Sequence, residues 1–356
     1  MNINNKILSS SNNYVDPNEL VKCYGSNELA NVKCLLINMP IREQAKPNNA
    51  PLGLCLLAAQ LKNYGAKVNI LDLNSFRIKD KIATERKLEN GRVLLAEEAE
   101  SKINNFVKIN DYHLVALSGL ITTLAWQKSV LEMVKKLSPS SFVVSGGGLA
   151  TEFREDLFNW MPDLDGVAHS EGDNIIIKIA RDAYLVNKDK SNTISKRAEI
   201  IAPNKTIIKE GKIYAIYAGG RPSNLNNLPL PDWEVLKNDP DNKTILENYI
   251  TSPIWGKEAR NSSATSFSMK RSINTVSSRG CPFACKFCFR GAQGERNYGI
   301  RSPENLFCEM KLYVEKYGID FLGYVDDNFA VSRKRIFDLE HLVGDWVDKN
   351  GLVWGT

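Results

Sequence analysis

INTVSSRGCPFACKFC, residues 273–288, sets the fold that we expect for the last part of this 356-residue chain. Its first five residues, Ile273–Ser277, predict a short buried strand, and this strand runs directly into a loop with three cysteines. Further elements follow downstream: strands at Phe321–Val325 and Leu352–Gly355, and helices capped by Ser302 and Ser332. Repeated strand–helix units with reactive groups at the strand ends are typical of a parallel (β/α) barrel.

The three cysteines of this loop are Cys281, Cys285 and Cys288. In a chain without a secretory signal, such a cluster favours metal ligation over disulfide bonds. Three thiolates from one loop can hold three corners of a [4Fe–4S] cubane and leave the fourth iron open. Structural zinc is the rival interpretation, but it requires four ligands. No fourth cysteine or histidine lies nearby, because Cys308 is 20 residues further on in a predicted helix.

Upstream, short apolar strands alternate with helices, which predicts a doubly wound parallel sheet. The expected strands are residues 32–38, 67–71, 114–118, 142–145 and 166–169. Ligands of this fold bind beyond the carboxyl ends of the strands. Glycines and small polar residues gather there: Ser118, Gly119, Thr122, Gly146, Gly147, Glu171 and Gly172. They form either a binding edge or a set of ordinary tight turns.

The alternation stops after residue 190. A hairpin is expected over Glu199–Ile216 with its turn at Glu210-Gly211, followed by a proline-rich segment at 228–233 and a long polar stretch. The predicted organisation is therefore a leader (1–30), a first domain (31–190), a linker with a hairpin (191–271) and the beginning of a barrel (272–356).

Charge and hydropathy argue against several classes of function. The formal net charge is +5, which is too small to indicate a nucleic-acid binder on charge alone. The polar start of the chain lacks the apolar core of a secretory signal, and no run reaches the roughly 18 apolar residues of a membrane span. We expect a cytoplasmic protein without a membrane partner.

The spacing Cys-x3-Cys-x2-Cys, with Phe287 directly before the last cysteine, resembles the radical S-adenosylmethionine (SAM) superfamily. The resemblance implies that the open iron chelates SAM and that an electron from the cluster yields a 5′-deoxyadenosyl radical. It also implies that Phe287 lies near the adenine. Asp326 and Asp327, at the end of the next strand, would contact SAM or substrate, unless they are solvated acids. A flavodoxin or ferredoxin would supply the electron.

The first domain resembles the Rossmann-like cobalamin-binding domain that precedes the barrel in one radical SAM branch. The resemblance rests on Pro51–Asp72, Ser118, Gly146-Gly147, Glu171-Gly172-Asp173 and the proline-rich segment. It implies that the strand-end residues Ser118, Gly119, Thr122, Gly146, Gly147, Glu171 and Gly172 bind cobalamin. Another cobalamin class places a histidine ligand after the first strand, but Asn38–Glu43 contains none. His113 precedes the third strand and should point away from the ligand edge.

This branch methylates unactivated carbons and also contains ring-forming members that resemble the anaerobic Mg-protoporphyrin ester cyclase. The resemblance therefore implies radical methylation or cyclisation of a small molecule. Two alternatives remain. One is a non-catalytic cobalamin-binding module. The other is a nucleic-acid-modifying methylthiotransferase, which would need a second cysteine triad, whereas Cys23, Cys34 and Cys55 are spread over separate elements.

The end of the sequence carries one more expectation. The run Leu352–Thr356 is apolar and predicts a strand of the kind that is buried on both faces in a parallel sheet. The family's barrel also has more strand–helix units than residues 272–356 supply. We therefore expect a C-terminally truncated chain, with part of the wall around SAM missing and weak turnover.

Overall fold

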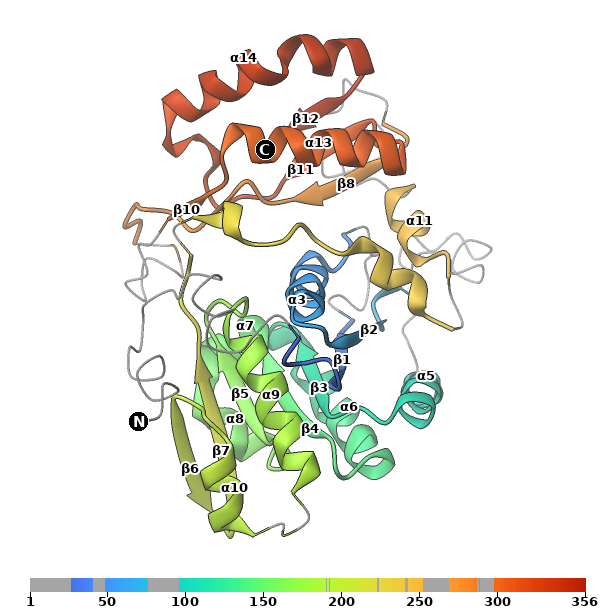
Figure 1. Cartoon of the computed structure of the whole chain (residues 1–356), viewed down its shortest axis with the longest axis vertical. Helices are drawn as coiled ribbons and strands as arrows, with labels where there is room; N and C mark the ends of the chain where they lie inside the picture. Colours follow the sequence, from blue (N-terminus) through green and yellow to red (C-terminus); the bar gives the residue numbers. More distant parts are fainter. Residues whose placement is uncertain are drawn as a thin grey trace. The chain divides into compact units, whose positions relative to one another are not determined.

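The computed structural model describes residues 27–40, 49–75, 96–189, 191, 193–222, 224–240, 243–251, 269–286, 288 and 298–356. The chain divides into two compact units (Figure 1), and each is described by itself. The first unit comprises Met1–Pro47, Gly53–Gly220 and Pro231–Lys243. The second comprises Asn48–Leu52, Arg221–Leu230 and Thr244–Thr356.

The first unit is built on a seven-stranded sheet with the strand order β2-β1-β3-β4-β5-β7-β6. The first five strands are β1 (Lys33–Asn38), β2 (Lys67–Asp72), β3 (Leu114–Ser118), β4 (Phe142–Gly146) and β5 (Gly166–His169). They are parallel, which confirms the predicted doubly wound sheet. The register pairs Asn38 with both Asp72 and Ser118, and Ser118 with Gly146, so the carboxyl ends meet at one edge.

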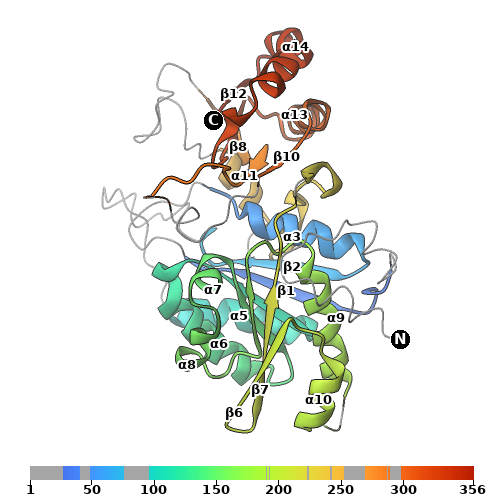
Figure 2. The same ribbon diagram turned by 90° about the vertical axis from the view of Figure 1, so that its left-hand side faces the viewer.

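Helices cover both faces of this sheet. Figure 2 shows α5, α6 and α8 on one face and α9 and α10 on the other. Alternate strand residues such as Leu35, Ile37, Val115 and Leu117 form the core on the first face, because successive side chains of a strand point to opposite sides. The helices are α3 (Leu52–Asn63), α5 (Ala96–Asn110), α6 (Leu124–Leu137), α7 (Gly147–Phe153), α8 (Leu157–Trp160), α9 (Ile175–Lys188) and α10 (Ile194–Ile200).

The hairpin that the sequence assigned to a linker lies in this sheet. Its strands are β6 (Lys205–Lys209) and β7 (Lys212–Ala218), and β7 pairs in parallel with β5. Both turn residues have positive φ, 51° at Glu210 and 74° at Gly211, as a two-residue hairpin turn requires. The hairpin starts later than predicted, because Thr193 caps α10 and this helix extends to Ile200. β7 lies between β5 and β6, and its five central residues are all buried, as expected for a strand inside a sheet.

The second unit contains a three-stranded parallel sheet with the order β12-β11-β8. Its strands are β8 (Ser272–Thr275), β11 (Phe321–Tyr324) and β12 (Val353–Gly355), joined through α13 (Pro303–Tyr317) and α14 (Arg333–Asn350). Both predicted caps are confirmed: Ser302 accepts from Asn305 N and Ser332 accepts from Arg335 N. Both helices end at a left-handed glycine, Gly318 and Gly351, so local chemistry fixes their limits.

Smaller elements complete the described chain. They are α11 (Ile245–Ile250), β9 (Ser278–Arg279), β10 (Gly299–Ile300), and the 3₁₀ turns η2 (Ile121–Thr123), η3 (Arg154–Asp156), η4 (Leu225–Asn227), η5 (Trp233–Asn238) and η6 (Phe329–Val331). Within the described residues, none of the helices combines the length and the apolar character needed to cross a membrane.

Candidate functional sites

The loops after β3 and β4 touch at the carboxyl edge of the first sheet. Gly147 has a φ of 78°, and a Cβ there would lie 3.1 Å from Gly119 O and 3.2 Å from Ser118 Oγ. Leu149 N donates to Gly119 O over 3.1 Å and fixes this approach. The structure therefore brings Ser118, Gly119 and Gly147 together, and only glycine fits at position 147 without strain.

The loop after β5 joins the same edge through a residue that the sequence did not single out. Thr151 Oγ1 donates to Gly147 O over 2.9 Å and accepts from Ser170 N over 3.1 Å. Ser170 has a φ of 65°, which turns the chain toward Glu171 and Gly172. A threonine one turn into a helix carries no signal for such a bridge, because Ser170 lies in a loop 19 residues further along the chain.

Thr122, which the sequence placed in this edge, is exposed on η2, whereas the neighbouring Thr123 is buried. Thr123 Oγ1 donates to Leu120 O over 2.8 Å and closes the loop. Leu120 and Ile121 are 49% and 52% exposed, so an apolar surface projects beside the glycines. The sequence does carry a signal for this apolar surface that was not among the predictions: two large apolar residues directly after a strand-end glycine.

His113 lies at the opposite edge of the sheet, as predicted. Its Nδ1 accepts from Lys33 N over 3.0 Å at the amino ends of β3 and β1. Its ring also meets the Tyr184 ring edge-on, and burial lowers the pKa of the imidazole. These contacts fix the ring away from the carboxyl edge.

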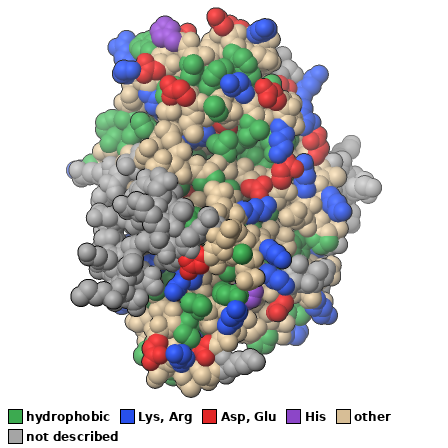
Figure 3. Space-filling view, viewed as in Figure 1, with side chains coloured by type: hydrophobic (Ala, Val, Ile, Leu, Met, Phe, Trp, Pro, Cys, Tyr) green, Lys and Arg blue, Asp and Glu red, His purple; other side chains and the backbone are tan. Residues whose placement is uncertain are grey.

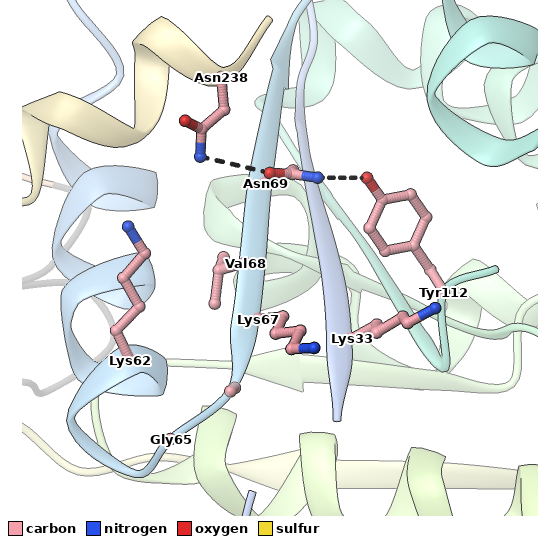
Figure 4. A pocket seen from close by; sticks show the side chains of 9 residues that line it. Lys33, Lys62, Gly65, Lys67, Val68, Asn69, Tyr112 and Asn238 are labelled. Carbon is pink, nitrogen blue, oxygen red and sulfur yellow. Dashed lines mark hydrogen bonds between the residues drawn. The ribbon is translucent and has the colours of Figure 1, made fainter. Parts of the chain in front are cut away.

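A pocket also opens at this amino edge (Figure 4), with a volume of about 530 Å³. Asn69 crosses it: its Nδ2 donates to Tyr112 OH over 2.7 Å, and its Oδ1 accepts from Asn238 Nδ2 over 3.4 Å. Lys62 at its rim pairs with Asp232. These polar groups are engaged with one another, and the pocket is remote from the predicted ligand edge.

In the second unit, the acids after β11 contact the start of the cysteine loop. Asp326 accepts from Ser277 N over 2.7 Å, from Ser277 Oγ, and from Ser278 Oγ over 2.7 Å. Asp327 Oδ2 accepts from Gly280 N over 3.0 Å. Asp326 therefore contacts the start of the cysteine loop, because the exit of β8 lies beside the end of β11. Its contact with SAM or substrate stays a prediction. Phe287 lies outside the described residues.

The three predicted ligands share one accessible loop. Cys285 is exposed, Cys281 and Cys288 are half-buried, and Cys288 N donates to Cys285 O over 3.1 Å in a tight turn. Asn328 Nδ2 approaches Cys281 Sγ at 3.9 Å. Among the residues that the structure describes, no three His, Cys, Asp or Glu side chains are arranged to hold a metal ion as they stand. The set of donors fits an iron–sulfur cluster, and the side chains would have to converge on it.

The sequence was compared with protein families and with known proteins. No protein-family model matches the sequence. The chain is 24% identical over 247 residues to an uncharacterised methyltransferase of Pyrococcus horikoshii, covering 69% of this chain and 46% of that protein. It is 21% identical over 225 residues to the anaerobic magnesium-protoporphyrin IX monomethyl ester cyclase of Cereibacter sphaeroides, covering 63% and 32%. The chain therefore spans less than half the length of either relative.

Two solved structures resemble the chain more completely. The radical SAM methyltransferase TsrM of Kitasatospora setae has a TM-score of 0.56 and 16% identity, covering 90% of this chain and 54% of that one. OxsB, a cobalamin-dependent SAM radical enzyme, has a TM-score of 0.56 and 15% identity, covering 87% and 36%. TsrM is also known with cobalamin and a [4Fe–4S] cluster bound. The chain has the fold of the cobalamin-dependent radical SAM enzymes.

Proposed function

We propose that this chain carries the cluster-binding and cobalamin-binding parts of a radical SAM enzyme that methylates or cyclises a small molecule. The observation that carries the proposal is the accessible thiol loop at the carboxyl end of β8, in a unit of parallel strand–helix repeats. When bound, the cluster would supply the electron that cleaves SAM. The solved TsrM complex contains tryptophan as substrate, which supports a small-molecule substrate here.

We assign separate roles in cluster binding to the cysteines and to the acids after β11. Cys281, Cys285 and Cys288 would hold three irons of the cluster. Asp326 and Asp327 would hold the backbone of the loop, since they already accept from Ser277, Ser278 and Gly280. Contact of Asp326, Asp327 or Phe287 with SAM stays a prediction.

At the sheet edge of the first unit, Gly147 is exposed and Gly119 and Gly172 are partly exposed, so a large flat ligand would lie against their backbone. The exposed Leu120 and Ile121 would cover apolar parts of the cobalamin ring. The predicted set Ser118, Gly146 and Glu171 lies on the same loops, and Thr151 joins it through its bridge between Gly147 and Ser170.

The methylthiotransferase alternative is disfavoured by the cysteines of the first unit. Cys34 and Cys55 are buried in the core, and burial raises the pKa of both thiols, so neither is available as a thiolate ligand. Figure 3 shows the face of the molecule seen in Figure 1, where basic and acidic side chains are interspersed. A nucleic-acid binder would be expected to present a continuous basic surface, and this face does not.

Anaerobic reconstitution of the full chain tests the proposal against the non-catalytic module. Gel filtration would measure how much cobalamin and radiolabelled SAM stay with the protein. We expect wild type to retain both, and Cys285→Ala to retain cobalamin but lose SAM. Equal SAM retention by Cys285→Ala would contradict the radical SAM assignment. Cobalamin binding without any SAM binding by wild type would support the module.

A further inference from the structure

Charged residues, among them two buried arginines, hold the segment that leads from β8 into the cysteine loop. This segment, Val276–Ser278, is called the exit segment below. Asp326 accepts from its amide and hydroxyl groups, and two arginines hold its carbonyls. A backbone segment with both kinds of group engaged has little freedom to shift.

The first arginine comes from the first turn of α14. Arg335 is 5% exposed, and its Nη2 donates to Ser277 O over 3.0 Å. Its Nε donates to Arg301 O over 3.0 Å and its Nη1 to Phe329 O over 3.4 Å. The guanidinium also lies over the Phe329 ring, with 5.2 Å from Cζ to the ring centroid. One side chain therefore ties together the exit segment, the start of α13 and the turn after β11.

The second arginine, Arg301, contacts Val276, the residue before Ser277. Arg301, also 5% exposed, donates from Nη1 to Val276 O over 3.1 Å and to Glu309 Oε2 over 2.5 Å. Glu309 accepts in turn from Thr275 Oγ1 over 2.9 Å. Arg301 thus has a buried carboxylate partner, whereas the guanidinium of Arg335 forms a fork that donates to three backbone carbonyls. Burying a guanidinium costs free energy, so a fold that merely needed packing would be better served by an apolar side chain.

We propose that Arg335 is a positioning residue for the iron–sulfur cluster, acting through the backbone of the exit segment. This inference rests on the proposed function. Arg335 holds Ser277, four residues before Cys281, and so fixes where the thiol loop begins. It also places a permanent positive charge at Ser277, in the segment that leads into a loop whose thiolates and cluster would be negative. Losing the fork should loosen the cluster, and losing the charge should make the cluster harder to reduce.

Three variants of the reconstituted full chain separate these effects from simple stability. Arg335→Gln removes charge and fork, Arg335→Lys keeps the charge without the fork, and Arg333→Gln is the control. Arg333 is exposed on the same helix, and its guanidinium lies over Phe337. The measurements are the rate of iron loss to a chelator and the midpoint potential from a redox titration followed by electron paramagnetic resonance.

We expect both Arg335 variants to lose iron about tenfold faster than Arg333→Gln, as for other residues that support metal ligands. The potential should become more negative in Arg335→Gln and stay near the wild-type value in Arg335→Lys. Iron loss from Arg335→Lys at the rate of Arg333→Gln would overturn the inference, and this variant decides alone if Arg335→Gln does not fold. If wild type takes up no cluster, the proposed function itself fails.

Discussion

At the scale of single residues, accessibility separates the cysteines of the loop from two cysteines of the first unit. Cys34 and Cys55 are buried in the first unit, whereas the three cysteines of the loop are exposed or half-buried. Cys285→Ala should therefore reduce the iron content of the reconstituted protein severely, because two thiolates hold a cubane poorly. Cys308→Ala is the matched control, since Cys308 is an exposed thiol on α13. Full iron in Cys285→Ala with loss in Cys308→Ala would show that the ligands are misassigned.

A second residue-scale prediction concerns pH. Asp182 on α9 is fully buried; burial raises its pKa to about 6 from an ordinary value of 3.8, although Tyr217 OH and Ala202 N donate to it. The folded pKa exceeds the unfolded one, so the charged form costs stability. The free energy of unfolding should fall by about 3 kcal/mol in total as the pH rises from about 3 to about 7, through both pKa values. Asp182→Asn should remove this component in urea titrations. Parallel pH profiles for variant and wild type would refute it.

At the scale of elements, close backbone contacts hold the loops at the sheet edge. Gly219 lies in the turn that follows β7. A Cβ on it would lie 1.7 Å from Glu171 O, in the loop that follows β5. Gly219→Ala should therefore lower the free energy of unfolding by about 3 kcal/mol. Gly53→Ala is the control: it lies in α3 with nothing within 4 Å of its added Cβ, and it should stabilise by about 0.5 kcal/mol. Chemical denaturation of both variants checks this, and equal effects would contradict the packing argument.

The elements also show how far the sequence could predict this structure. Strand limits and helix caps such as Ser302 and Gly318 were predictable because their signals are local. The hairpin was recognised, but its place in the sheet depends on the pairing of β7 with β5, which no local pattern reveals. For the same reason the partners of Asp326, 49 residues earlier in the chain, could not be predicted from the Asp-Asp-Asn sequence.

At the scale of the whole molecule, the inventory of histidines limits how cobalt could be ligated. The chain has three: His113 at the amino edge of the first sheet, His341 on α14 and His169 at the end of β5. Neither His113 nor His341 belongs to the proposed cobalamin edge, and the first strand is not followed by a histidine. Among the three, His169 lies at that edge, where we expect an ordinary strand-end residue and not a cobalt ligand. Bound Co(II) cobalamin should then show no nitrogen superhyperfine splitting in electron paramagnetic resonance. Nitrogen splitting that disappears in His169→Ala or His113→Ala would contradict this prediction.

The central claim is that the loop of Cys281, Cys285 and Cys288 holds a cluster with one iron open to SAM. Electron paramagnetic resonance of the reduced, reconstituted chain with and without SAM tests it most directly. The account predicts about four irons per chain and a signal that changes when SAM is added, because SAM coordinates the open iron. A cluster signal that SAM leaves unchanged, or a chain that binds zinc but no cluster, would contradict it.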